Sequence, residues 1–82
     1  MTTTIEVTVR SWDCDSMPDR AKVRVAAYLP SNYSVARAWV MGDGNVAVLV
    51  EGEDNAGWTA EGYVIPRLAS GLYTAKIVEE AA

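Results

Sequence analysis

The side chains that could perform chemistry in this chain are few and poorly matched to one another. The sequence contains one cysteine, Cys14, and no histidine. Cys14 stands between Asp13 and Asp15, and neighbouring anions disfavour the thiolate form that a nucleophilic cysteine requires. A zinc site built from cysteine and histidine and a disulfide within the chain are both excluded. We therefore predict no catalytic residue and a non-enzymatic protein.

Oxygen ligands and glycines offer no better site. The densest group of side-chain oxygens, Glu51–Asn55, lacks the spacing of a calcium-binding loop. Acidic residues that precede a helix are explained by the favourable field at its N-terminus. The Gly42-Asp43-Gly44 run lacks the helix and the lysine of a phosphate-binding loop, and a tight turn explains it. The sequence predicts no metal ion and no cofactor.

Aromatic side chains are the more informative group, with three tryptophans and four tyrosines in 82 residues. Tryptophan, tyrosine and arginine dominate the binding energy of many protein interfaces. Trp12 falls on the polar side of an alternating segment, and Tyr63 and Arg67 lie opposite an apolar helical stripe that begins after Trp58. We predict that these four residues, Trp12, Trp58, Tyr63 and Arg67, contact a partner. The alternative for any one tryptophan is that it fills the small core.

Four elements would have to position these side chains. Residues 3–12 alternate strictly, with Ile5, Val7 and Val9 on one side, which is typical of a half-buried strand. Residues 17–29 fit either a strand or a helix. The capping-box form of Ser16–Asp19 and the stop signal at Leu29–Asn32 favour the helix.

Two β-rich runs, residues 34–41 and 45–51, flank the glycine-containing turn and predict a β-hairpin. Neither face of this hairpin is strongly polar, apart from Arg37 and Glu51. A sheet that is nearly apolar on both faces must be covered on both, either by helices or by another subunit. This observation raises the expectation of a homodimer, which a short chain without disulfides also favours.

The last element is predicted to be an amphipathic helix over residues 59–78, with Thr59 as its N-cap. Its apolar stripe repeats at helical spacing across Gly71, and consists of Ile65, Leu68, Ala69, Leu72, Tyr73 and Ile77. Pro66 should kink this helix or mark the start of its regular part. Gly71 weakens the helix, and a break there is the alternative.

These elements predict a single α+β domain over residues 1–82, in the order β-α-β-β-α. Its three-stranded sheet contains a central hairpin, and the C-terminal helix packs on the sheet. If residues 17–29 form a strand, the order becomes β-β-β-β-α.

The segment AGWTAEGYVIPRLASGL, residues 56–72, resembles a stretch found in small uncharacterised proteins of actinobacteria and their phages. The resemblance implies an accessory protein of an actinobacterium or its phage and carries over no functional residue. Gly62 departs from the acidic residue expected at that position.

Charge and hydropathy narrow the class of partner. The first 38 residues carry five basic and four acidic side chains, whereas the remaining 44 carry two and seven. An acidic half does not attract nucleic acid, because nucleic-acid binding depends on neutralising phosphates. No apolar run approaches the roughly 20 residues of a membrane span. A lone cysteine without an export signal predicts a cytoplasmic protein.

The function expected from these observations is that of a small non-enzymatic accessory protein that acts by protein–protein interaction and self-associates. Two alternatives stay open. One is an acidic inhibitor or nucleic-acid mimic, possibly phage-encoded, that occupies a basic site on a host protein and gathers its acids on one face. The other is a small-molecule binding protein, which requires an enclosed aromatic pocket.

Overall fold

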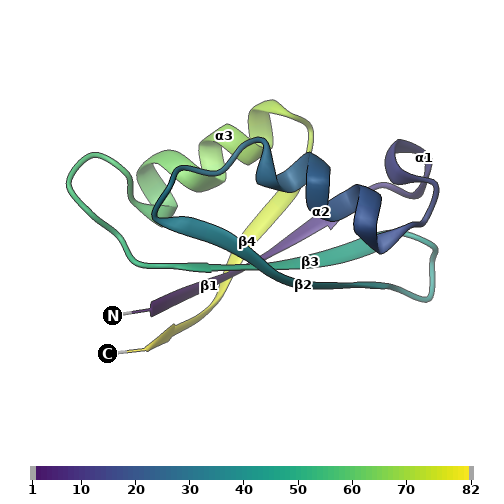
Figure 1. Ribbon diagram of the computed structural model, residues 1–82, viewed down its shortest axis with the longest axis horizontal. Coiled ribbons are helices and arrows are strands. Elements are labelled where there is room, and N and C mark those ends of the chain that lie inside the picture. Colours follow the sequence, from purple (N-terminus) through teal and green to yellow (C-terminus); the bar gives the residue numbers. More distant parts are fainter. Residues whose placement is uncertain (1, 82) are drawn as a thin grey trace.

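The computed structural model describes residues 2–81 and forms two layers, with the helices on one face of a β-sheet (Figure 1). In chain order the elements are β1 (Thr2–Val9), α1 (Ser11–Cys14), α2 (Pro18–Ala26), β2 (Tyr33–Val40), β3 (Val46–Gly52), the π-helical turn η1 (Ala60–Val64), α3 (Ile65–Ser70) and β4 (Thr74–Ala81).

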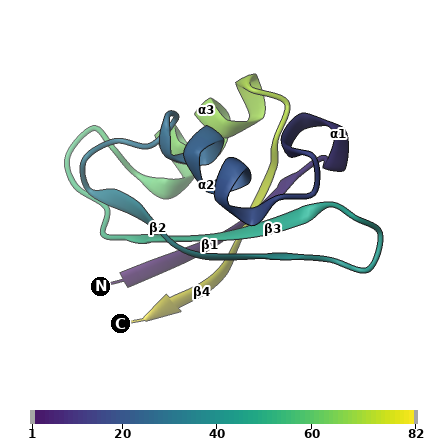
Figure 2. The same ribbon diagram turned by 45° about the vertical axis from the view of Figure 1, so that its right-hand side comes forward.

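The sheet has four strands in the order β2-β3-β1-β4, and each neighbouring pair is antiparallel. Two β-α-β units are therefore interleaved, each with a strand of the other unit between its own two strands. This is the ferredoxin-like, split β-α-β arrangement. Both helical connections cross the same face, with α2 over β2 and β3 and α3 beside β4 (Figure 2). The opposite face of the sheet carries no helix.

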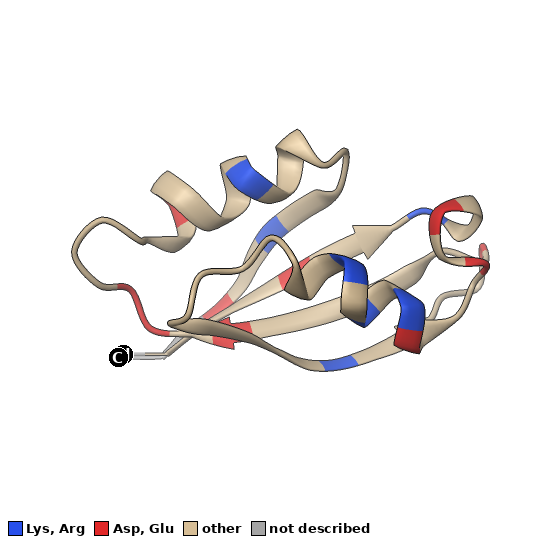
Figure 3. Ribbon diagram, turned by 45° about the horizontal axis from the view of Figure 1, so that its top comes forward, with Lys and Arg blue, Asp and Glu red and all other residues tan. Residues whose placement is uncertain are grey.

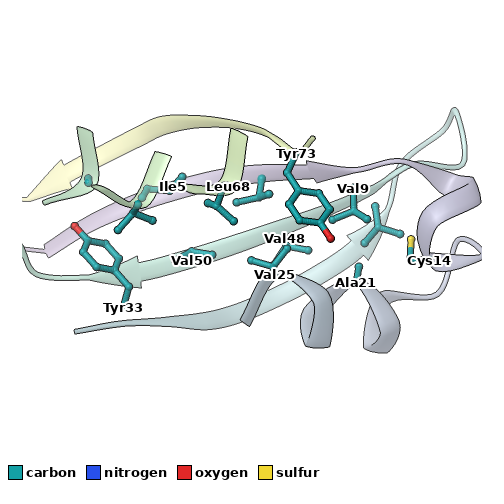
Figure 4. Packing of buried hydrophobic residues seen from close by; sticks show 14 residues of the cluster. Ile5, Val9, Cys14, Ala21, Val25, Tyr33, Val48, Val50, Leu68 and Tyr73 are labelled. Carbon is teal, nitrogen blue, oxygen red and sulfur yellow. The ribbon is translucent and has the colours of Figure 1, made fainter. Parts of the chain in front are cut away.

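The core lies between the sheet and the helices (Figure 4). Strict alternation in β1 directs Ile5, Val7 and Val9 to the helices, and all three are fully buried, as predicted. Val50, Val48 and Val46 of β3 lie directly opposite them in the antiparallel register. These six cross-strand partners form the floor on which α2 and α3 pack. The predicted strand over residues 3–12 is wrong beyond Val9, because Ser11–Cys14 form the short helix α1, which places Trp12 on a helix.

Residues 18–26 form a helix, as the local signals favoured, and Ala21 and Val25 are its buried residues. The predicted capping box is wrong. The N-cap residue is Met17, and no side chain caps this helix. The hydroxyl of Ser16 instead donates to the carbonyl oxygen of Gly44 at 2.7 Å, which fixes the start of α2 to the β2–β3 turn.

The predicted hairpin is confirmed, with β2 and β3 joined through the turn at residues 41–45. Within the turn, the Met41 carbonyl accepts a hydrogen bond from the Gly44 N–H, and Gly44 has a φ of +89°. A conformation with positive φ is open to glycine at no steric cost. The β2–β3 register shifts between Val35 and Arg37, which leaves Ala36 as an extra residue in β2.

The predicted C-terminal helix over residues 59–78 is wrong beyond Ser70. The chain turns at Gly71 and then forms β4, the fourth strand of the sheet, instead of ending in a helix. The spacing of Tyr73 and Ile77 explains the error, because residues four apart share a face in a strand as well as in a helix. Tyr73, directly before β4, and Ala75 and Ile77 within it pack on the core. The sheet therefore has four strands where three were expected.

The beginning of the same segment agrees better with expectation. Thr59 is the N-cap residue, and its hydroxyl accepts the Gly62 N–H at 3.0 Å. The first turn is π-helical, since the Val64 N–H bonds to the Thr59 carbonyl five residues back. Pro66 stands in the first turn of α3 and so marks the start of the regular helix, one of its two predicted roles.

Candidate interaction surface

The face of the sheet away from the helices is uncovered in the monomer. Alternation places Thr4, Glu6 and Thr8 of β1 on this outer face, and Ala47, Leu49 and Glu51 of β3 beside them. Arg37 and Trp39 of β2 extend the apolar part of this surface, because their register partners are Leu49 and Ala47. The β1–β4 half is polar by contrast, with Lys76 4.0 Å from Glu6.

The large apolar side chains that are exposed are spread over the molecule, and three of them belong to β2 and to the helix α2 that packs on it. Trp39 is 37% exposed on the outer face, and Val40 is 45% exposed on the helix side of the same strand. Val23 on the overlying helix α2 is 72% exposed. Sequence reasoning missed these residues as candidates. The signal that could have identified them was present, since both faces of the predicted hairpin were apolar.

The two edges of the sheet differ in how they are protected. β4 carries Lys76 and Glu79 on its exposed positions and shifts register against β1 between Thr4 and Ile5. Charged side chains and bulges are the usual devices that prevent a strand from pairing with another chain. β2 has a single charged residue, Arg37, and its guanidinium carbon lies 5.2 Å from the centroid of the Trp39 ring. Its regular part, from Arg37 to Val40, is the less protected edge.

The four predicted partner-binding residues do not form one surface. Trp58 and Tyr63 lie together, with ring centroids 6.2 Å apart, at the end of the loop that follows β3. Arg67 of α3 lies over the Tyr28 ring at 5.9 Å. Trp12 stands apart on α1, where its side chain is 73% exposed. Only Trp58 and Tyr63 are brought together.

The acidic segment after β3 has a structural role in the monomer. One oxygen of Asp54 accepts the Tyr33 hydroxyl at 2.5 Å and the Ala60 N–H at 2.8 Å. The amide nitrogen of Asn32 donates to the carbonyls of Glu53 and Trp58. An open hollow of about 440 Å³ lies here between residues 31–34 and 51–55. Asp54 and Asn32 thus fix the loop to the start of β2.

A second polar cluster lies under α2. The Tyr28 and Tyr73 rings meet edge to face at 5.4 Å, and the Arg24 guanidinium is 3.4 Å from Asp13. Burial raises the pKa of the Tyr73 hydroxyl above its ordinary value, and the negative charge of Asp13 raises it further. A hydrogen bond from Arg24 opposes these two effects. The cluster thus connects α1, α2 and the start of β4.

Other routes to chemistry find no support in the part of the chain that the structure describes. Cys14 is 1% exposed, and its thiol faces the Arg10 carbonyl. Residues 2–81 contain no group of three or more acidic or cysteine side chains placed to hold a metal ion. None of the helices described has the length and apolar character needed to cross a membrane.

Comparison with known proteins adds no family to this description. Neither the protein-family models, nor the curated proteins, nor the solved structures contain a match to the chain.

Proposed function

We propose that this protein is a non-enzymatic interaction domain that self-associates through the β2 side of its sheet. The observation that carries the proposal is the exposure of two neighbouring apolar side chains on the edge strand β2, where Trp39 and Val40 are 37% and 45% exposed on opposite faces. An edge strand that leaves large apolar side chains exposed presents both unpaired backbone groups and apolar surface to another chain.

The arrangement of charge favours this proposal over an acidic mimic of nucleic acid. Acidic side chains are spread over the molecule, at the loop after β3, around α1 and the β2–β3 turn, and on the strands between them (Figure 3). A mimic requires them on one face, where they would imitate a row of phosphates. Asp54, moreover, is engaged by Tyr33 and Ala60 within the fold.

The outer face also differs from four-stranded sheets that bind RNA. Such sheets stack bases on aromatic side chains of the face. Here the two central strands present Thr4, Glu6 and Thr8 from β1 and Ala47, Leu49 and Glu51 from β3. Trp39 is on this face but belongs to the edge strand β2, and the two carboxylates of the central strands would repel phosphates. A protein partner suits this surface better than RNA.

Sedimentation equilibrium over a dilution series tests the proposal. We expect the apparent mass to rise from monomer toward dimer with concentration. The Trp39→Ala variant should weaken the dimer at least tenfold, since a buried tryptophan at an interface contributes about 2 kcal/mol or more. Leu72→Ala, which removes an apolar side chain that is 80% exposed on another part of the surface, is the control and should not change the dimer.

Two outcomes would count against the proposal. A chain that stays monomeric up to about 1 mM associates by less than about 4 kcal/mol and is not a dimer in any useful sense. If instead Trp12→Ala abolishes association and Trp39→Ala leaves it intact, the interface lies at α1 and includes Trp12, one of the four residues predicted from the sequence to contact a partner. Far-ultraviolet circular dichroism of each variant would verify that it is folded.

A further inference from the structure

The open edge of β2 can be defined by its backbone hydrogen bonds. The Met41 N–H bonds to the Asn45 carbonyl at 2.7 Å, which makes this a hydrogen-bonded pair of the hairpin. Hydrogen-bonded pairs recur at every second residue of an antiparallel ladder. Trp39 and Arg37 therefore direct their backbone groups to Ala47 and Leu49 of β3. Ala38 and Val40 direct theirs outward, to the edge where the sheet ends.

When an antiparallel strand is added to this edge, the residues of both strands that direct their backbone groups toward the contact must lie opposite one another. For a second copy of β2 with two-fold symmetry, three registers satisfy that requirement near the regular part of the strand. Their symmetry axes pass through Arg37, Ala38 or Trp39. A shift by one residue is not available, because it would exchange the two faces of the added strand.

Charge distinguishes these registers. An axis through Arg37 places two guanidinium groups directly opposite each other, which is destabilising. An axis through Trp39 leaves each Arg37 opposite Met41 of the other copy. An axis through Ala38 places Arg37 of each copy opposite Trp39 of the other, so the dimer contains two such pairs. The same cation and ring already lie 5.2 Å apart within one chain, so their geometry suits a cation–π contact.

We propose that two copies of this chain pair through β2 in antiparallel register about Ala38, forming one continuous eight-stranded sheet. The inference rests on the proposed function and specifies its geometry. Arg37 and Trp39 flank Ala38 symmetrically on one face of the strand, which is the self-complementarity that a two-fold interface requires. This pattern fits a second copy, whereas an unrelated strand would need a matching aromatic and cation of its own.

The small side chains of this edge permit the close approach that strand pairing needs. Ala38 lies at the centre of the contact, and Val40 near its end would lose part of its 45% exposure. Only a short stretch of each strand takes part, because the bulge at Ala36 ends the regular edge. The buried area is consequently below the roughly 800 Å² per partner of a standard interface, and the dimer should be concentration-dependent.

A pair of single-cysteine substitutions tests the register. Ala38→Cys would lie opposite its own copy, at a Cα separation of about 5.5 Å, which is within the range of a disulfide. Ala36→Cys is the matched control. It lies opposite Val40 in this register and about 14 Å from its own copy. The unchanged protein measures the background from Cys14, which is buried.

We expect mild oxidation to convert Ala38→Cys to a disulfide-linked dimer of doubled mass on a non-reducing gel, while Ala36→Cys and the unchanged protein stay monomeric. Linkage of Ala36→Cys in place of Ala38→Cys would overturn the register. If the unchanged protein dimerises in sedimentation and neither variant is linked, the β2 pairing is wrong and the proposed function stands. A protein that is monomeric in sedimentation would overturn both.

A proline substitution keeps the inference testable if the cysteine variant folds poorly. Ala38→Pro removes an N–H that points to the open edge, so the β2–β3 ladder keeps its hydrogen bonds. The folded variant should lose the sedimentation dimer. Retention of the dimer by a folded Ala38→Pro chain would overturn the pairing, because its two central hydrogen bonds could not form.

Discussion

Gly71 lies against the ring of Tyr28, so closely that a Cβ on residue 71 would stand 2.6 Å from the Cζ atom of that ring. Tyr28 packs edge to face on Tyr73 and lies beneath Arg67, so a shift of its ring would disturb both contacts. The backbone does not require glycine here, since a φ of −88° is open to any residue. Gly71 therefore permits the close packing of the α3–β4 turn on Tyr28.

The contact predicts that Gly71→Ala destabilises the fold by about 1–3 kcal/mol, the usual cost of overpacking. Urea unfolding followed by tryptophan fluorescence measures this difference. Gly42→Ala is the matched control, since nothing lies within 4 Å of a Cβ at that position. Equal free energies of unfolding for the two variants would contradict the packing role.

The backbone conformation of Leu72 predicts that its replacement by glycine stabilises the fold. Its φ is +69°, a left-handed conformation that costs a residue with a Cβ roughly 1–2 kcal/mol, and its side chain is 80% exposed. Leu72→Gly should therefore raise the free energy of unfolding by about 1 kcal/mol. Leu72→Ala removes the exposed side chain but retains the strained Cβ, so it should give no such gain. A gain of the same size from alanine would mean that exposure, and not the backbone, is the cause.

The hydrogen bond between Tyr33 and Asp54 predicts that substitutions of the two residues lower the free energy of unfolding in a non-additive way. Removal of the carboxylate by Asp54→Ala leaves the Ala60 N–H and the Tyr33 hydroxyl without their shared acceptor. Hydrogen bonds to a charged group each contribute about 1.5–3 kcal/mol, so the variant should lose at least that much. Tyr33→Phe and the double variant complete a thermodynamic cycle in urea. Strictly additive losses would show that the two side chains do not interact.

The raised pKa of Tyr73 predicts that the free energy of unfolding depends on pH in the alkaline range. Because its pKa in the fold is above its ordinary value of 10.0, the folded state holds the phenol proton to higher pH than the unfolded chain does. The stability that this difference provides is complete below pH 10 and decreases as the pH rises above it. Tyr73→Phe removes the titrating group. The stability of the unchanged protein relative to this variant should therefore fall between pH 9 and 11, as measured by urea unfolding, and a constant difference would contradict the shift.

Local patterns predicted the elements whose signal is complete within a few residues. The alternation of β1, the glycine turn between β2 and β3, and the proline-led start of α2 are of this kind. β4 was mistaken for helix because the spacing of Tyr73 and Ile77 satisfies both periodicities. Only pairing with β1, some 70 residues away, decides between them. Long-range pairing of this sort leaves no local mark in a sequence.

The candidate surface was predicted less well than the fold, for a related reason. The apolar character of both hairpin faces was visible in residues 34–51, and it led to the expectation of a covering subunit. The edge position of β2 was not visible, because it depends on where β1 and β4 lie in the sheet. Trp39 was consequently not singled out from the other strand residues. Trp12 was chosen by its position in a predicted strand, and Arg67 by its position on a predicted helix.

The central place of β1 also has a consequence for how the chain folds. This strand comes first in the sequence, yet it pairs with β3 on one side and with β4 on the other. Contacts between such distant segments are slow to form, because a long loop must close before they contribute. The hairpin and α2 can assemble early, but β1 keeps an open edge until the last eight residues of the sheet have arrived. Loss of those residues would leave a three-stranded intermediate that is prone to aggregate.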